Sequence, residues 1–300
     1  MTPGTATRPV RWPEDAAAIH RLLAAGWRAG RPETSLHPGD LYWRAGLRDL
    51  ADLQVWEDGS GEIVGFVELD SKDSSCDIAV APGRAAALEL ELFAWAETAA
   101  RRRGDGRTFI VGCFDGNEER AARLRSLGFE PTDDFYPHHL HPLDGPLPSA
   151  SRRDGDVVRP LREDELAARV ELGGAAFGST ALTVEKLRRI RTGPGYDPDL
   201  DLVAVDGAGA LAAFALFWFD PHERLGQLEP LGCHPDHQRR GLARTLIEEG
   251  LRRLRDRGTR EALVVTGGKN AATRSLYEEC GFRPVAEDRD WSKRIRGTDA

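Results

Sequence analysis

A short basic segment in the second half of the chain carries the residue types that bind a diphosphate. It lies between a predicted strand and a long amphipathic helix, and we call it the phosphate arm: Gln238, Arg239, Arg240, Gly241, Leu242, Ala243 and Arg244. The N-terminus of a helix offers unpaired N–H groups and a partial positive charge. Small residues such as Gly241 and Ala243 let a diphosphate approach those amides closely. The pattern predicts an anion site.

A solvated basic surface is the alternative explanation for these arginines. A Gly-x-Ala after a loop is a weak signal alone, and the chain has 41 basic residues. We prefer this explanation for the arginines of 252–257, further along the helix. For the phosphate arm we favour anion binding, because of the elements that surround it.

Those elements are predicted from hydrophobic periodicity and turn residues. Strands are expected at 201–205, 211–219, 227–233 and 262–266, the first two around an Asp206-Gly207 turn. Apolar residues on one helical face predict a helix over 242–256, and a shorter helix is expected over 271–280. Asn270 is suited to cap the start of that helix, and Gly281 to end it in the left-handed conformation.

The same arrangement occurs twice in the chain. Asn117 and Asn270 are 153 residues apart, and so are the Gly-Phe pairs that begin at Gly128 and Gly281. An Arg-Pro-x-Arg motif also opens each half. We therefore predict a domain at 1–141, a Pro/Gly/Ser-rich linker at 142–156 and a second domain at 157–300.

Two segments of the second half resemble a known family. Residues 231–243 resemble the acetyl-CoA-binding segment of the GNAT superfamily of N-acetyltransferases, whose loop has the form Gln/Arg-x-x-Gly-x-Gly/Ala. Residues 270–282 resemble the second cofactor segment of the same family. The two-domain organisation is similar to that of the mycothiol synthases, although the residues give no reason to carry over their substrate.

The resemblance implies an α+β fold of two tandem GNAT-like αβα sandwiches, each with a mixed, mostly antiparallel sheet flanked by helices. It implies two splayed central strands between which the pantetheine of acetyl-CoA inserts, and amides of the phosphate arm that bind the pyrophosphate. Further cofactor contacts are expected from the backbone N–H groups of Leu231, Gly232 and Cys233, which would hold the oxyanion, and from Asn270 and Tyr277.

Two catalytic residues follow from the resemblance. Tyr277 matches the tyrosine near the cofactor sulfur, where it would protonate or anchor the thiolate; its alternative is a tyrosine of the core. Glu229 lies on the strand before the arm, where many family members place a base that acts through water. Its apolar neighbours would raise its pKa, as a base requires. The alternative for Glu229 is an outward-facing strand residue.

The first half lacks these features at the corresponding positions. Glu229 falls on Cys76, Tyr277 on Leu124, and Gly241 on Ala87. Ala243 falls on Glu89, whose negative charge would oppose a diphosphate. We infer that the first domain serves packing or acceptor binding and does not bind the cofactor.

The predicted function is transfer of an acetyl group from acetyl-CoA to a primary amine of a small acceptor, by direct attack in a ternary complex. The alternative is an acyl-CoA-binding sensor or scaffold without catalysis. A monomer or a homodimer is expected. No metal is predicted, because the four cysteines are scattered, and His138, His139 and His141 are explained as surface residues beside the linker.

Composition restricts the other possibilities. The net charge of −8 argues against a nucleic-acid partner, which would favour a dominant basic face. No stretch approaches the roughly 20 apolar residues of a membrane-spanning helix, so no membrane partner is expected. The N-terminus has no signal pattern, which predicts a cytoplasmic location. Only four of the 41 basic residues are lysine, a bias typical of a GC-rich bacterial genome.

Overall fold

The order of strands across one continuous sheet defines the architecture. The computed structural model describes residues 4–28, 36–47, 52–70, 75–102, 108–147, 157–179 and 181–295. Its described strands form a twelve-stranded sheet in the order β1-β2-β3-β4-β5-β12-β6-β11-β10-β9-β8-β7. Neighbouring strands are antiparallel except for β4 with β5 and β10 with β11, which are parallel. The sheet is therefore mixed and mostly antiparallel, as predicted.

The two halves contain the same succession of elements. The first has β1 (Ala6–Pro9), α1 (Ala16–Arg28), α2 (Pro38–Leu47), β2 (Leu53–Glu57), β3 (Ile63–Asp70), β4 (Ser75–Val80), α3 (Ala85–Arg101), β5 (Thr108–Phe114), α4 (Glu118–Ser126) and β6 (Glu130–Pro142). The second has β7 (Val157–Pro160), α5 (Leu166–Phe177), α6 (Val184–Arg191), β8 (Asp201–Val205), β9 (Leu211–Asp220), β10 (Leu225–Cys233), α7 (Leu242–Asp256), β11 (Glu261–Val265), α8 (Ala271–Glu279) and β12 (Arg283–Arg294). The predicted internal repeat is confirmed.

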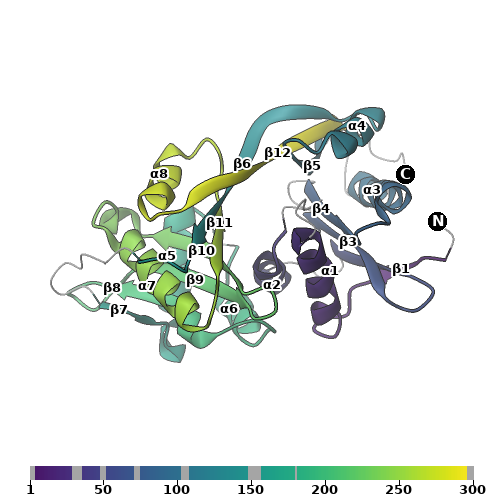
Figure 1. Ribbon diagram of the computed structural model, residues 1–300. Coiled ribbons are helices and arrows are strands. Elements are labelled where there is room, and N and C mark those ends of the chain that lie inside the picture. The colour runs from purple at the N-terminus through teal and green to yellow at the C-terminus, as the bar shows by residue number, and fades with distance from the viewer. Residues whose placement is uncertain are drawn as a thin grey trace.

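Helices cover both faces of the sheet in each half (Figure 1). In the first half, Leu23 of α1 and Leu41 of α2 share a core with Phe66, whereas Leu92 of α3 packs with Ile78 in a separate core. The second half repeats this division, with α7 and α8 in one core and α5 and α6 in another. A strand whose two faces are both buried reads as a continuous apolar run, and β9 has that character. The predicted αβα sandwiches are confirmed.

The final strand of each half lies among the strands of the other half. β12 pairs with β5 of the first half through Asp288 opposite Phe114 to Arg294 opposite Thr108. β6 pairs in turn with β11 of the second half. The two exchanged strands also pair with each other at the centre of the sheet, where Figure 1 shows them running between the halves. The sequence predicted two tandem units but not this exchange.

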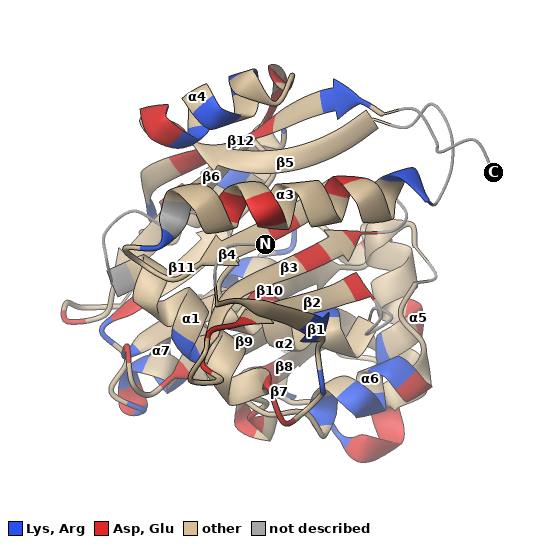
Figure 2. Cartoon of the chain, turned by 90° about the vertical axis from the view of Figure 1, so that its right-hand side faces the viewer, with Lys and Arg blue, Asp and Glu red and all other residues tan. Residues whose placement is uncertain are grey.

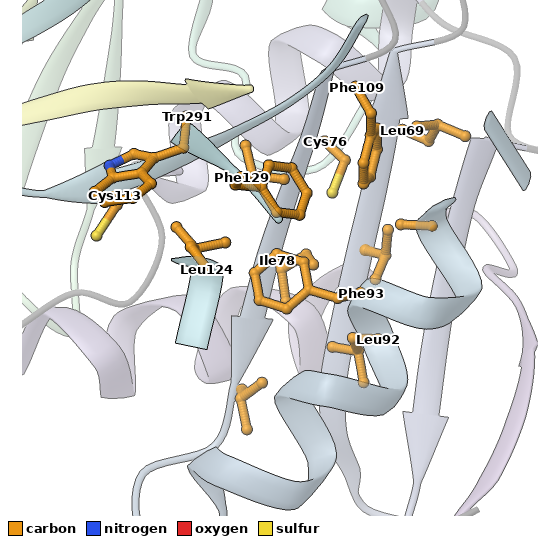
Figure 3. Packing of buried hydrophobic residues seen from close by; sticks show 14 of the residues in the cluster. Leu69, Cys76, Ile78, Leu92, Phe93, Phe109, Cys113, Leu124, Phe129 and Trp291 are labelled. Atoms are coloured by element: carbon orange, nitrogen blue, oxygen red, sulfur yellow. The ribbon is translucent and has the colours of Figure 1, made fainter. Parts of the chain in front are cut away.

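Trp291 shows how the exchange closes a core. This β12 residue is 5% exposed and belongs to the core cluster of the first half. Figure 3 shows its indole near Cys113 and Leu124. Burying an aromatic side chain removes on the order of 200 Å² from water, a contribution of about 5 kcal/mol before entropic costs. A strand of the second half therefore completes the core of the first.

The predicted linker at 142–156 remains a proposal. It divides the sequence into two repeats, but the exchange of β6 and β12 means that the two repeats are not separate units in space. Leu143 directly follows β6, is buried, and donates its N–H to the carbonyl oxygen of Arg260 at 2.8 Å. Residues 148–156 of the proposed linker lie outside the described residues.

Several helices present charged residues on the surface of the molecule. Acidic and basic residues are interspersed over α3, α4 and α6 on the side shown in Figure 2. Among the described residues, no helix combines the length and the hydropathy that crossing a membrane requires.

Candidate functional site

The paired central strands of the second half separate partway along their length. β10 pairs with β11 only from Leu225 to Gln227. Beyond that point β10 stays paired with β9, after a register shift between Leu228 and Leu231. Among the described residues, the part of β10 beyond Gln227 has no ladder partner in β11. This is the splayed pair that the resemblance implied. β4 and β5 of the first half separate in the same way after Cys76 and Val111.

The phosphate arm leads from the open end of β10 into α7. Gly241 is the N-cap of α7 with φ +84°, and no side chain caps the helix. A Cβ added at Gly241 would meet no atom within 4 Å. The first-turn N–H groups of α7 are thus left without a capping side chain, beside a backbone position that glycine keeps open. These features fit a bound diphosphate.

The arginines of the arm differ in their contacts. Within the described chain Arg239 is exposed and makes no ion pair, and its φ is +59°. Arg240 lies 2.8 Å from His237 Nδ1. Arg244 donates to Glu248 at 3.0 Å. Arg239 therefore keeps its full hydrogen-bonding capacity for an anion.

Asn270 caps α8 as predicted, since its side-chain oxygen accepts from the N–H of Thr273 at 3.1 Å. Asn117 does the same for α4, accepting from Arg120 at 3.0 Å. The capping role is therefore common to both halves. A contact of Asn270 with the cofactor remains a prediction.

Glu229 lines a cavity at the junction of the two halves. It lies just past the last β10–β11 pair, and its backbone oxygen accepts a hydrogen bond from the indole N–H of Trp218 at 2.8 Å. Burial and the negative charge of Asp40 raise the pKa of Glu229 to about 7, with Arg44 opposing the shift. A carboxyl group with this pKa can accept a proton near neutral pH.

Tyr277 lies on α8 and is 5% exposed. Its ring centroid is 6.3 Å from that of His139, a residue of the exchanged strand β6. Burial and the charges of Glu229 and Cys280 raise the pKa of Tyr277 well above its ordinary value. The influence of Glu229 indicates that the two predicted catalytic side chains lie in the same region, and Tyr277 remains a protonated hydrogen-bond donor at physiological pH.

The cavity has a volume of about 580 Å³ and an acidic lining. Five carboxylates and one guanidinium line it: Asp40, Asp77, Glu229, Asp288, Asp290 and Arg44. They come from both halves, because α2 and β4 belong to the first half and β12 crosses into it.

Arg44 is the one basic residue among the described residues that line the cavity. Arg44 pairs with Asp77 at 2.7 Å and with Glu68 at 3.6 Å. Burial, together with Asp134 and Asp77, raises the pKa of Asp290 to about 6 against the hydrogen bond from Tyr136. Such crowding of carboxylates favours a cationic ligand. Only Glu229 among these residues was predicted from sequence, since no local motif marks the others.

A larger cavity, of about 920 Å³, lies elsewhere. It includes Leu225 and Glu261, which are at the paired ends of β10 and β11, and it contains neither Glu229 nor any residue of the arm. Volume alone therefore does not identify the site.

The loop of the first half that corresponds to the phosphate arm is shorter. Four residues, 81–84, connect β4 to α3, whereas eight residues, 234–241, connect β10 to α7. Glu89 of α3 is fully buried and forms ion pairs with Arg123 at 2.5 Å and Arg120 at 3.4 Å, both on α4. These pairs join α3 to α4, and the positions matching Glu229 and Tyr277 hold the buried residues Cys76 and Leu124.

The histidines beside the linker are not on the surface, so that prediction is wrong. His138, His139 and His141 are 0%, 1% and 6% exposed. They lie on β6, which is paired on both sides by β11 and β12 and is therefore not an edge strand. Within the described part of the chain, no group of three or more His, Cys, Asp or Glu residues is placed to hold a metal ion.

Comparison with known proteins agrees with this geometry. Residues 181–282 match the acetyltransferase (GNAT) family. A mycothiol acetyltransferase of Streptomyces bingchenggensis is 26% identical over 295 residues, which cover 92% of each chain.

Two solved structures share the fold of the whole chain. A tandem GNAT protein from the clavulanic acid biosynthesis pathway has a TM-score of 0.71 at 19% identity, covering 98% of this chain and 100% of that one. A GCN5-related N-acetyltransferase from Sphaerobacter thermophilus has a TM-score of 0.68 at 22% identity, covering 99% and 98%. The whole chain thus shares the fold of these GNAT structures, and residues 181–282 of its second half match the GNAT acetyltransferase family.

Proposed function

We propose that this chain is an N-acetyltransferase that moves an acetyl group from acetyl-CoA to a primary amine by direct attack in a ternary complex, and that only the second half binds the cofactor. The observation that carries the proposal is the position of Glu229. It lies where β10 leaves β11, in a cavity lined by acidic residues, on the strand that leads into the uncapped start of α7.

The residues divide into a binding set and a catalytic set. The amides and arginines of the phosphate arm hold the pyrophosphate, with Asn270 as a further contact. The N–H groups of Leu231, Gly232 and Cys233 stabilise negative charge on the carbonyl oxygen during attack. Acetyl-CoA itself supplies the thioester that is attacked and the thiolate that leaves.

Glu229 and Tyr277 act on the acceptor amine and on the leaving sulfur, respectively. Glu229, directly or through water, accepts a proton from the acceptor ammonium, so that a neutral amine can attack. Tyr277 donates a hydrogen bond to the departing sulfur. Because its pKa is raised further above that of a thiol, full proton transfer from the phenol is uphill. Stabilisation of the thiolate by hydrogen bonding is therefore its main role.

A Tyr277→Phe enzyme tests that role. We expect kcat to fall roughly tenfold to a hundredfold, because one hydrogen bond to developing charge is lost. The acid side of the pH profile should keep its midpoint, since Glu229 remains. Steady-state kinetics from pH 5.5 to 9, with melting temperature as a check on folding, would measure both. An unchanged kcat would remove Tyr277 from the mechanism.

The acidic cavity supports a cationic amine as the acceptor. A ligand that also carries a carboxylate would meet the charges of Asp77, Asp288 and Asp290. The relatives named mycothiol acetyltransferases make the amine that those enzymes acetylate the first acceptor to test.

An acceptor panel tests the whole proposal through release of free CoA. It contains the amine of the mycothiol acetyltransferase reaction, simple primary amines, and amino acids matched to them by an added carboxylate. We expect each amine to exceed its carboxylate-bearing partner by tenfold or more in kcat/KM, since one repulsive charge pair costs about 1.4 kcal/mol or more here. Binding of acetyl-CoA without turnover by any amine would favour the sensor instead.

A further inference from the structure

Helix α2 of the first half makes buried polar contacts with β10, the strand that carries Glu229. Gln227 of β10 donates through Nε2 to Asp40 Oδ1 at 2.8 Å. Its Oε1 lies 2.5 Å from His37 Nδ1. The backbone N–H of Gly39 lies 3.1 Å from the same nitrogen, so His37 Nδ1 contacts both the Gln227 amide oxygen and the backbone of α2. Asp40 Oδ2 in turn accepts from the backbone N–H of His37 at 2.9 Å.

This network is buried and tightly packed. His37, Asp40 and Gln227 are each no more than 9% exposed. A Cβ added at Gly39 would come within 2.3 Å of Gln227 Oε1 and 2.7 Å of the Trp218 ring. Trp218 then donates to the backbone oxygen of Glu229. The start of α2 thus packs against Gln227 and Trp218. Gln227 lies two residues before Glu229 on β10, and Trp218 hydrogen-bonds to the backbone of Glu229.

We propose that α2 is part of the catalytic apparatus, with Asp40 and Arg44 as positioning residues that set the protonation of Glu229 from the opposite half of the chain. The inference rests on the proposed function for its catalytic meaning. Asp40 and Arg44 line the same cavity as Glu229 and carry opposite charges. The first half then does more than pack: it supplies the electrostatic environment in which the second half works.

Titratable side chains around Glu229 influence its protonation, and they come from several elements. Asp40 and Arg44 face it from α2, and Tyr277 faces it from α8. Across the cavity lie Asp77, Tyr136, Asp288 and Asp290. Burial raises the pKa of Asp40, whereas Arg44 and the hydrogen bonds from His37 and Gln227 oppose the shift. Both oxygens of Asp40 accept hydrogen bonds from donors that cannot be acceptors, which suits the ionised form. Removing the charge of Asp40 should therefore lower the pKa of Glu229, and removing the charge of Arg44 should raise it.

The test measures Glu229 directly and needs no acceptor. Carboxyl carbons of glutamate are labelled with ¹³C in the full chain, the Glu229 signal is assigned by its loss in Glu229→Gln, and it is titrated by NMR. We expect a midpoint near 7 in the parent. The midpoint should be lower by roughly half a unit or more in Asp40→Asn and higher by a similar amount in Arg44→Gln.

Asp58→Asn is the matched control, because Asp58 belongs to the first half and pairs with Arg84, away from the cavity. Its Glu229 midpoint should equal that of the parent. A folded Asp40→Asn and a folded Arg44→Gln that both keep the parental midpoint would overturn the inference, and so would shifts of the same sign. Because the readout is a titration, it stays interpretable if no acetyl transfer is found, and the proposed function then fails separately.

Discussion

A Gly241→Glu enzyme should lose measurable affinity for acetyl-CoA while remaining folded. Gly241 caps α7 with φ +84° in open surroundings, so the new side chain meets no neighbouring atom and its cost is confined to the left-handed backbone, while it places a carboxylate at the proposed diphosphate site. Two like charges about 4 Å apart near a protein surface repel by about 4 kcal/mol, which corresponds to roughly a thousandfold weaker binding. Calorimetric titration measures this change against a parent expected to bind one acetyl-CoA per chain.

Gly83→Glu is the matched control for this experiment. Gly83 lies in the loop before α3, also has φ +84°, and also has no atom within 4 Å of an added Cβ. Both variants carry the same backbone strain, about 1–2 kcal/mol for a side chain in the left-handed region. Gly83→Glu should bind acetyl-CoA as the parent does. Equal losses in the two variants would show that strain, and not the diphosphate site, was responsible.

A Glu229→Gln enzyme should bind acetyl-CoA normally and turn over 10²–10⁴ times more slowly, the usual contribution of a general base. The amide preserves size and some hydrogen bonding but cannot accept the proton. Calorimetry for binding and steady-state kinetics for kcat separate the two steps. Glu261→Gln, an exposed position at the far end of β11, is the comparison and should keep parental kcat.

The pH profile provides the second half of that test. Glu229 acts in its deprotonated form, and its pKa is raised to about 7 by burial and Asp40. Parental kcat/KM should therefore fall as pH drops through about 7 and level off above it. In Glu229→Gln this acid limb should disappear. If the limb persists at the same pH in the variant, another group is the base.

Features encoded locally were accessible from sequence. The leucine periodicity of 242–256 gave the extent of α7, and Asn270 and Gly281 act as the predicted helix cap and left-handed terminus. Each depends on contacts within one or two turns of chain, where side-chain chemistry determines conformation. The fold of the first half was predicted from its repeat of the second half, because its own residues indicate that fold less clearly.

Features that depend on which strands pair were not accessible. Asp288 and Asp290 belong to a polar strand, and only the pairing of β12 with β5 brings them to a cavity with Glu229. The polar run around His138 looks like an exposed edge until β12 covers it. The contact between Asp40 and Gln227 joins residues 187 positions apart. No periodicity or motif predicts a contact between residues so far apart in the sequence, since the contact depends on which strand edges are unpaired after each half folds.

The exchanged strands also order events during synthesis on the ribosome. β5 is complete long before β12 is made, because residues 115–282 must be translated first. Until then β5 has an unpaired edge, and the site that Trp291 will fill is open to water. An open strand edge beside exposed apolar surface is the kind of feature that chaperones bind and that aggregation exploits. We therefore expect that the first half completes its sheet and core only after β12, near the end of the chain, has been synthesised.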